Sequence, residues 1–480
     1  MNRRMIFNIV GKIVLVEAAL FLLPTAVSLY YNESCTASFL ISAAIAAAFG
    51  GLLVAISKPD YRVIYAKEGY IVVALSWIAL TMIGALPFTL SGEIPSYIDA
   101  VFETVSGFTT TGASILTNVE ALSKGLLFWR SFTHWVGGMG VLVFVMAIVP
   151  NMSERSIHVL RAEVPGPTVG KIVPRLKDTA KILYIIYLGM TLVQIVLLVA
   201  GKMPVFDSIV HAFGTAGTGG FGVRANSISG YSPYLQWVIT IFMFLFGVNF
   251  NLYYMLLIKK FKAALNSTEI LVYFCIVVFA VGIIAFNIYD LYNAFEPTLR
   301  AACFQVVSII TTTGYSTADF NLWPSLSKTV LLLLMFIGAC AGSTGGGIKV
   351  SRVVILCRQI RCEIQRMMHP RAIKKVRFEG KAVDKQTLTG VTNYLAVYVV
   401  SLVIVFFLIS FDGFSLETNI SAATSCFNNI GPGFDAVGPM ASYADYSAFS
   451  KIVLSAAMLL GRLEIFPLLV IMIPSTWTKK

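Results

Sequence analysis

Four short stretches carry residue types that suit ion coordination: Thr110-Thr111-Gly112, Gly217-Thr218-Gly219, Thr312-Thr313-Gly314 and Asn429-Ile430-Gly431. The last glycines of these stretches lie 107, 95 and 117 residues apart in turn. Glycine reaches positive φ without steric cost, which lets a loop point its carbonyl oxygens at an axis. A ring of such carbonyls can replace the hydration shell of an ion. The stretches therefore predict an ion filter built from four loops, to which the threonine hydroxyls can add oxygens.

A second interpretation stays open for each single loop, because glycine and threonine also let transmembrane helices pack closely. Each stretch follows a short segment of mixed polarity and precedes a long apolar run. A unit that recurs about every hundred residues and cannot close alone must assemble with its copies. The recurrence favours the filter over helix packing.

Composition identifies a polytopic membrane protein. Hydrophobic residues make up 57% of the chain, charged residues 12%, and the mean hydropathy is +0.80, whereas about a quarter of the residues of a soluble domain are charged. Of the 36 Lys and Arg residues, 28 fall in segments that the topology places on one side, as expected of cytoplasmic loops. The net charge of +12 therefore reflects the cytoplasmic loops of a membrane protein and does not indicate nucleic-acid binding. The same placement predicts that both termini lie in the cytoplasm.

The sequence offers little support for an enzyme. It contains no HExxH, GxSxG or Walker A motif, which are signatures of common hydrolytic and nucleotide-binding sites. The seven cysteines and four histidines lack the spacing of disulfides or metal ligands. We expect no catalytic residues, no organic cofactor and no bound metal other than an ion at the filter.

Apolar runs long enough to cross a bilayer define a hairpin and four repeats. The hairpin pairs residues 5–30 with 36–57, and no small-residue cleavage site marks its first run as a signal peptide. The division is 1–69 for the hairpin with its link, then 70–181, 182–268, 269–388 and 389–480 for the repeats. Pore helices are predicted at 99–108, 207–214, 297–310 and 417–427, and return spans at 126–149, 234–258, 328–357 and 450–474. The fold class is an all-α membrane protein with four span–pore-loop–span repeats in pseudo-four-fold order around a central pore.

Several polar residues inside these elements have two interpretations. Asp99 and Asp207 lie near the starts of two pore helices, where each carboxylate either caps free N–H groups or attracts cations at the pore mouth. His134 is interpreted as a hydrogen-bonded helix residue rather than a proton carrier, and the glycines between Trp135 and Gly140 as sites of close helix packing.

Two features depart from four-fold symmetry. Small residues interrupt the return span of repeat three from Gly338 to Gly347, including the run Gly342-Ser343-Thr344-Gly345-Gly346-Gly347. Non-helical backbone in a membrane must line water or be buried in protein. Arg462 lies deep in the last apolar run, where a charge costs roughly 2.5–3.5 kcal/mol. A local ion pair with Glu464 would explain Arg462 structurally; a gate made of a swinging loop and a fixed charge would explain both features.

With these residues in place, positions 70–475 resemble the Trk/Ktr superfamily of potassium-uptake proteins, of the TrkH/TrkG type, and the extra hairpin fits the Trk branch. The resemblance implies K+ uptake across the cytoplasmic (inner) membrane through one pore per subunit. It also implies a homodimer and a cytoplasmic ring of TrkA-like nucleotide-binding regulatory subunits.

The resemblance assigns residues to roles. The filter would be Thr110–Ala113, Gly217–Gly220, Thr312–Tyr315 and Asn429–Pro432, with Gly112, Gly219, Gly314 and Gly431 as matching glycines. The stretch Gly338–Lys349 would be an intramembrane gating loop, with Arg462 beside it. Since Ala113 and Gly220 replace the aromatic residue of tetrameric potassium channels, and only Tyr315 remains, we expect a less stringent preference for K+ over Na+.

The alternative function is an ion-coupled secondary carrier, a K+/H+ or K+/Na+ symporter with broken helices at the midplane. Four loops entering from one face favour the pore, because carriers typically place one site between two inverted halves. The segment 349–385 carries eleven basic residues, which suits either anionic lipid or an acidic partner.

Overall fold

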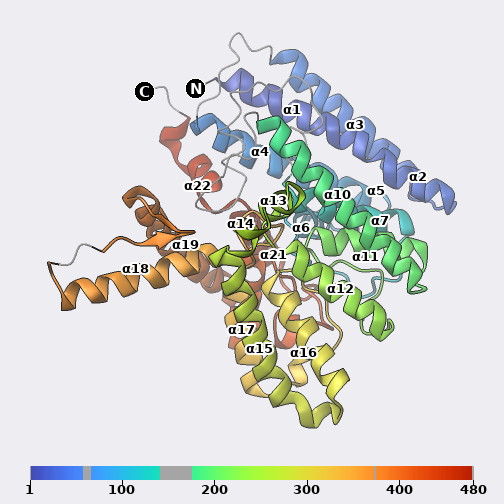
Figure 1. The fold of residues 1–480 in the computed structure, drawn as a ribbon. Helices are drawn as coiled ribbons and strands as arrows, with labels where there is room; N and C mark the ends of the chain where they lie inside the picture. Colours follow the sequence, from blue (N-terminus) through green and yellow to red (C-terminus); the bar gives the residue numbers. More distant parts are fainter. Residues whose placement is uncertain (1, 58–65, 141–175, 372–373, 478–480) are drawn as a thin grey trace.

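The computed structural model describes residues 2–57, 66–140, 176–371 and 374–477, and its regular structure is almost entirely helical (Figure 1). By length and composition, six described helices are able to cross a membrane, or seven if one bent pair counts as a single span. Within the described ranges, the strands are β1 Arg377–Phe378 and β2 Lys381–Ala382, paired antiparallel. The described structure therefore has the predicted all-α class.

The N-terminal hairpin forms as predicted. It consists of α1 Arg3–Leu20, α2 Leu22–Tyr30 and α3 Thr36–Ile56. Glycines let α1 and α3 cross closely, since a Cβ on Gly11 would lie 2.9 Å from the carbonyl oxygen of Gly50. Arg3 Nη2 also donates to the carbonyl of Trp477 at 2.7 Å. The hairpin is thereby fastened to the C-terminal end of the described chain.

The four repeats follow in order. Repeat one comprises α4 Ala66–Gly84, α5 Leu86–Leu90, the pore helix α6 Tyr97–Phe108 and α7 Lys124–Gly138. Repeat two comprises α10 Leu176–Ala200, the pore helix α11 Val205–Ala216, α12 Pro233–Phe246, α13 Phe250–Leu257 and α14 Phe261–Leu265. Repeat three comprises α15 Thr268–Tyr292, the pore helix α16 Phe295–Ile310, η1 Phe320–Leu322, α17 Ser325–Phe336 and α18 Val350–Met368. Repeat four comprises α19 Lys385–Ile409, η2 Ser410–Asp412, the pore helix α20 Leu416–Asn428, η3 Asp435–Val437, α21 Ala448–Arg462, α22 Phe466–Met472 and η4 Pro474–Thr476.

The prediction that only repeat three has a broken return span is wrong. In repeat two, α12 and α13 meet at 91°, where Asn249 caps the second helix by accepting from the N–H of Asn251 at 2.9 Å. In repeat four, α21 ends at Arg462, and Glu464 and Ile465 take φ values of 55° and 68°. Repeat three differs from these two repeats because the non-helical segment between α17 and α18 is longer than their breaks. The end of the return span predicted at 126–149 lies outside the described residues.

Return helices press against the pore helices at glycine. A Cβ on Gly137 would lie 1.9 Å from the carbonyl oxygen of Phe108, and a Cβ on Gly461 would lie 1.9 Å from that of Phe427. The predicted close packing of the glycine cluster is confirmed at Gly137. Buried apolar side chains gather in two cores, one mostly from the hairpin and repeats one and four, the other mostly from repeats two and three.

Candidate functional site

Each of the four pore helices leads into its loop through the same hydrogen bond. The amides of Thr111, Gly219, Thr313 and Ile430 donate to the carbonyls of the residues five positions earlier, Ser106, Gly214, Ser308 and Ser425, at 2.8–2.9 Å. Each loop therefore begins at the C-terminal end of a helix, where the helix dipole places partial negative charge. The equal hydrogen bonds also define which residues of the loops are equivalent.

Backbone angles show the same four-fold pattern. Thr110, Thr218, Thr312 and Asn429 have φ between 53° and 58°. Two residues later, Gly112, Gly220 and Gly314 have φ of 80–81° and Gly431 has 105°. Non-glycine residues rarely adopt this left-handed region and do so mainly at functional sites. The alternation of a left-handed residue with a left-handed glycine is the structural unit of the site.

The expected register of the second loop is wrong by one residue. Gly220, and not Gly219, has positive φ and is equivalent to Gly112. The second loop is therefore Thr218–Phe221 rather than Gly217–Gly220. Phe221 takes the position of Tyr315, which corrects the expectation that Gly220 replaces the aromatic residue. Gly217 ends its helix with φ of −71°, and three glycines within four residues gave the sequence no means of telling which one turns.

The four loops close into a ring through contacts between glycine and carbonyl. A Cβ on Gly112 would lie 2.0 Å from the carbonyl oxygen of Gly219, and a Cβ on Gly220 would lie 2.1 Å from the carbonyl oxygen of Thr313. A Cβ on Gly314 would lie 2.0 Å from the carbonyl oxygen of Ile430, and a Cβ on Gly431 would lie 2.7 Å from the carbonyl oxygen of Thr111. The order runs from loop one to two, three, four and back to one. Any side chain at these glycines would displace a carbonyl of the next loop.

Within the described part of the chain, two buried side-chain oxygens at the start of the loops have no hydrogen-bond partner: Thr110 Oγ1 and Asn429 Oδ1. An unsatisfied buried polar atom costs roughly 1–3 kcal/mol, which a coordinated ion would offset. At the equivalent positions, Thr218 Oγ1 donates to the carbonyl of Gly217 at 2.6 Å and Thr312 Oγ1 accepts from the amide of Gly346 at 2.7 Å. Carbonyl and hydroxyl oxygens without a carboxylate suit a dehydrated monovalent cation.

Side chains behind the ring join the first loop to the second. His134 Nδ1 donates to the carbonyl of Gly107 at 2.7 Å, and its Nε2 accepts the amide of Phe221 at 3.3 Å. His134 is thus a hydrogen-bonded helix residue, as interpreted. Because one ring nitrogen donates and the other accepts, the imidazole is neutral.

A buried ion pair that the sequence analysis missed reinforces the same seam. Arg130 Nε lies 2.5 Å from Glu103 Oε1, and both side chains are buried. Glu103 Oε2 accepts the amide of Ile115 at 3.0 Å, beyond loop one, and Arg130 Nη1 donates to the carbonyl of Gly222 at 3.2 Å, beyond loop two. The signal was an acid in the middle of a pore helix and a lone arginine in an apolar span, which in a membrane usually pair.

Tyrosines join two further seams. Tyr315 Oη donates to the carbonyl of Phe221 at 2.9 Å, between loops three and two. Tyr443 Oη donates to the carbonyl of Gly431 at 2.9 Å, while the amide of Tyr443 donates to the carbonyl of Ser114 at 2.8 Å, between loops four and one.

A vestibule of about 320 Å³ opens on the far side of the ring from the helix ends, and Asp445 is the carboxylate among its described lining residues. Asp99 and Asp207 do not line it. Their carboxylates instead meet Lys451 Nζ at 2.7 Å and Tyr231 Oη at 2.8 Å. Ser96 caps α6, and α11 has no side-chain cap. The capping interpretation of these acids is therefore wrong, and neither acid lines the vestibule.

The acid at the start of a pore helix contacts the return helix of the preceding repeat at three seams. Lys451 pairs with Asp99, Trp237 Nε1 donates to Glu296 at 3.2 Å, and Lys328 Nζ lies 3.1 Å from Glu417. At the remaining seam, Lys124 Nζ stands 5.7 Å from the ring centre of Phe206. We call these contacts the inter-repeat belt.

The segment between α17 and α18 lies directly below the ring. Its ends meet at a parallel bridge between Ile337 and Ile348. A single carboxylate oxygen, Glu269 Oε1, accepts the amides of Ala341 at 2.7 Å and of Ser351 at 3.1 Å. One acid therefore holds both ends of the loop.

The middle of this loop contacts other repeats. The amide of Phe250 donates to the carbonyl of Gly342 at 3.0 Å. Arg462 Nη1 donates to the carbonyl of Thr344 at 2.8 Å, and Nη2 donates to the carbonyls of Gly138 at 2.7 Å and of Gly137. The amide of Gly346 also donates to Thr312 Oγ1 of the third loop, so the segment contacts repeats two, three and four, and Arg462 links it to repeat one.

Within the described residues, Lys349 and Arg462 both donate to backbone carbonyls. Lys349 Nζ turns back to the carbonyls of Gly345 and, at 3.2 Å, Gly346. Glu464 forms an ion pair with Arg352 at 2.5 Å. The predicted local ion pair between Arg462 and Glu464 is therefore wrong. Lys349 and Arg352 are both buried, which removes them from the basic surface expected over 349–385.

Comparisons with known proteins agree along the whole chain. A family model described as a cation transport protein, TrkH, matches residues 36–479. The chain is 35% identical to the Trk system potassium uptake protein TrkH of Salmonella typhimurium, over 99% of this chain and 100% of that one, and 32% identical to TrkG of Escherichia coli, over 99% and 98%. The crystal structure of the potassium transporter TrkH from Vibrio parahaemolyticus has a TM-score of 0.89 and 31% identity, covering 100% of both chains. The likeness confirms the predicted fold class.

The inter-repeat belt predicts a ranking of stabilities. Lys451 and Asp99 are 9% and 26% exposed, and Lys328 and Glu417 are 27% and 50% exposed. Exposed pairs contribute about 0–1 kcal/mol, whereas breaking a buried pair costs about 3–5 kcal/mol. We expect Lys451→Met to lower the melting temperature of the purified protein more than Lys328→Met, as measured by thermal-shift fluorescence in detergent. Equal shifts, or the reverse order, would contradict this reading of the belt.

Proposed function

Since this chain belongs to the TrkH family of cation transport proteins, we propose that it takes up K+ across the cytoplasmic membrane through the ring of filter loops. Its relatives are named as potassium uptake proteins, which makes it a transporter rather than an enzyme. The main support for the proposal is that four glycines with positive φ form a closed ring, in which each glycine packs against a carbonyl of the next loop.

The oxygen set supports a monovalent ion. The four filter loops contain no carboxylate, so an ion there meets only carbonyl and hydroxyl dipoles. Such a site replaces the hydration shell without holding the ion too tightly to leave. The alternative of an ion-coupled symporter gains no specific support, because the loops form one ring of parallel repeats and not a site between inverted halves.

Substitution of the ring glycines tests the filter. A serine at Gly220 or Gly314 would place a Cβ about 2 Å from a carbonyl oxygen of the next loop and would strain a left-handed backbone. We expect both variants to fold and to lose about tenfold in Rb+ over Na+ flux in proteoliposomes, equivalent to roughly 1.4 kcal/mol. Gly390→Ser, where a Cβ meets nothing within 4 Å, is the control. Wild-type ratios in both ring variants would remove the loops from the role of filter.

We further propose that Gly342–Gly347, with Lys349 and Arg462, forms the gate. The loop's position under Thr312 supports this, as does its hold by Arg462. The guanidinium also opposes a cation below the filter, by about 4 kcal/mol at 4 Å for an effective dielectric of 20. Loop and charge act together, because the same side chain fixes the loop and repels the ion.

Arg462→Ala, and separately deletion of Gly345–Gly347, should raise K+ flux through the purified chain without any regulatory subunit. Selectivity should stay unchanged, because the ring is untouched. Single-channel recording or Rb+ flux measures both quantities. Arg224→Ala serves as the control, since Arg224 lines the vestibule on the other side of the ring. If both gate variants fold and conduct no more than wild type, the barrier lies elsewhere.

A homodimer, a TrkA-like nucleotide-binding subunit and cytoplasmic termini complete the proposal. Support comes from family membership and from α18 with the β1–β2 hairpin, which extend away from the helical body (Figure 1). The basic residues that remain exposed there include Arg361, Arg366, Arg371, Lys374 and Lys375. A surface of this charge fits an acidic partner or anionic lipid.

Charge reversal distinguishes the two. If an acidic protein partner binds here, replacing Arg371, Lys374 and Lys375 by Glu should abolish co-purification of a soluble Rossmann-type subunit. The matched control reverses Lys259, Lys260 and Lys262, which are also exposed, and should retain the subunit. Unchanged recovery in both would favour lipid.

A further inference from the structure

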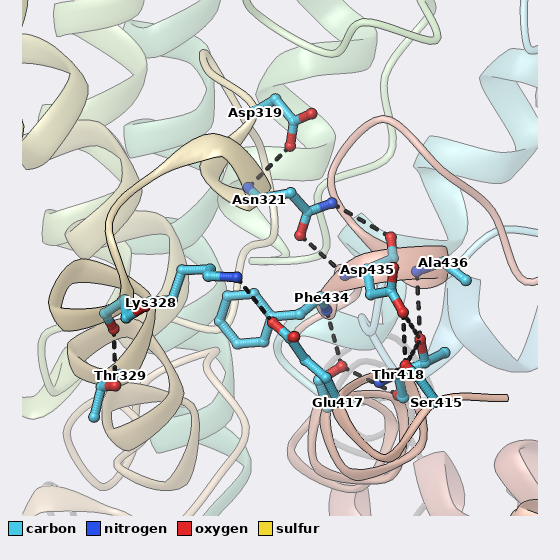
Figure 2. A network of polar contacts seen from close by, with 12 residues as sticks. Asp319, Asn321, Lys328, Thr329, Ser415, Glu417, Thr418, Phe434, Asp435 and Ala436 are labelled. Carbon is cyan, nitrogen blue, oxygen red and sulfur yellow. Dashed lines mark hydrogen bonds and ion pairs between the residues drawn. The ribbon is translucent and has the colours of Figure 1, made fainter. Parts of the chain in front are cut away.

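The seam between loops three and four is held by a polar cluster centred on Asp435 (Figure 2). Asp435 lies three residues beyond Pro432, the end of the fourth loop, and has φ of 56°. A residue other than glycine adopts this left-handed backbone conformation only where surrounding contacts stabilise it. The contacts of Asp435 show what holds it.

Its carboxylate is bound to the start of the pore helix that carries the same loop. Asp435 Oδ2 accepts from Ser415 Oγ at 2.6 Å and from Thr418 Oγ1 at 2.7 Å. Ser415 is also the N-cap of α20, since its Oγ accepts the amide of Thr418 at 3.1 Å. These hydrogen bonds lower the pKa of Asp435, so the carboxylate stays ionised at neutral pH. A negative charge is favourable at a helix N-terminus.

Its backbone is bound to repeat three. Asn321 Oδ1 accepts the amide of Asp435 at 3.0 Å, and Asn321 Nδ2 donates to the carbonyl of Asp435 at 3.3 Å. Asp319 Oδ1 accepts the amide of Asn321 at 3.0 Å and so orients η1. Lys328 and Glu417 of the inter-repeat belt lie beside this contact (Figure 2). One residue thus joins the exit of loop four to two elements of different repeats.

The stretch between the loop and Asp435 leaves little freedom. The amide of Phe434 donates to Ser421 Oγ at 2.8 Å, and the amide of Gly433 donates to the carbonyl of Val437 at 2.7 Å. A shift at Asp435 is therefore transmitted to Pro432, whose Cδ lies 2.9 Å from the Cβ position of Gly314. Loop four presents the Ile430 carbonyl to the same glycine.

The Asp435 carboxylate is placed to act through its hydrogen bonds, because it does not line the vestibule. Ala436, Val437 and Gly438 line the vestibule, but Asp435 and Asn321 do not. We propose that Asp435 is a positioning residue for ion selection, which fixes the Ile430 carbonyl in the ring by tying the exit of loop four to Ser415, Thr418 and Asn321. This inference rests on the proposed filter.

The decisive variants are Asp435→Gly and Asn321→Ala. Glycine removes the side chain and adopts positive φ freely, so backbone strain does not confuse the result. Because Asp435 is exposed and water competes for its bonds, we expect a graded loss, about threefold in the Rb+ over Na+ flux ratio, with the melting temperature little changed. Asp435→Asn keeps an oxygen acceptor and tolerates positive φ, and it should restore the wild-type ratio.

Two parallel variants separate the possible failures. Asp445→Asn removes a carboxylate that does line the vestibule, and should leave the ratio unchanged. Gly314→Ser tests the filter itself.

If Gly314→Ser loses selectivity while Asp435→Gly and Asn321→Ala do not, the positioning role is overturned and the filter stands. If Asp435→Asn behaves like Asp435→Gly, charge and not position matters, which also overturns it. If Gly314→Ser keeps selectivity, the proposed filter fails first. Should Asp435→Gly not fold, the double variant Ser415→Ala/Thr418→Val tests the same carboxylate contacts.

Discussion

The contact between a left-handed glycine of one loop and a carbonyl of the next is the constraint on which the rest of the structure depends. A Cβ at three of these glycines would come within about 2 Å of the facing oxygen, closer than real side chains ever pack. The ring therefore exists only while each loop keeps its register within a fraction of an ångström. Backbone geometry of this kind cannot hold itself, since short loops lack a core. The pore helices, the buried Glu103–Arg130 pair, His134 and the tyrosines at the seams supply the missing rigidity.

Charge on the two sides of the ring is arranged differently. The helix C-termini direct partial negative charge toward the loops, and the side-chain cations just below, Lys349 and Arg462, are bound to carbonyls of the intramembrane loop and of repeat one. The intramembrane loop thus binds these cations through backbone carbonyls, the same kind of oxygen that faces the glycines of the ring.

The sequence predicted the larger features well because they depend on length and hydropathy. The hairpin, the four pore helices and the outer spans all follow from apolar runs of the right length, and the close contact at Gly137 follows from a glycine cluster. The register of loop two did not follow, since Gly217, Gly219 and Gly220 differ only in backbone angle. Breaks such as the one between α12 and α13 were hidden because apolar residues flank them on both sides. The partners of Asp99 and Asp207 come from residues distant in sequence, which no local pattern encodes.

The inter-repeat belt also has a consequence for synthesis. Three of its contacts join repeats that are neighbours along the chain, but Lys451 reaches back to Asp99, and Asn429 Nδ2 reaches Thr111 Oγ1 at 2.9 Å. Contacts between residues so far apart form late, because a long stretch of chain must be ordered before they are made. A nascent chain that has inserted only three repeats carries three quarters of a pore with an open side. The ring is therefore completed only when the last repeat has entered the membrane.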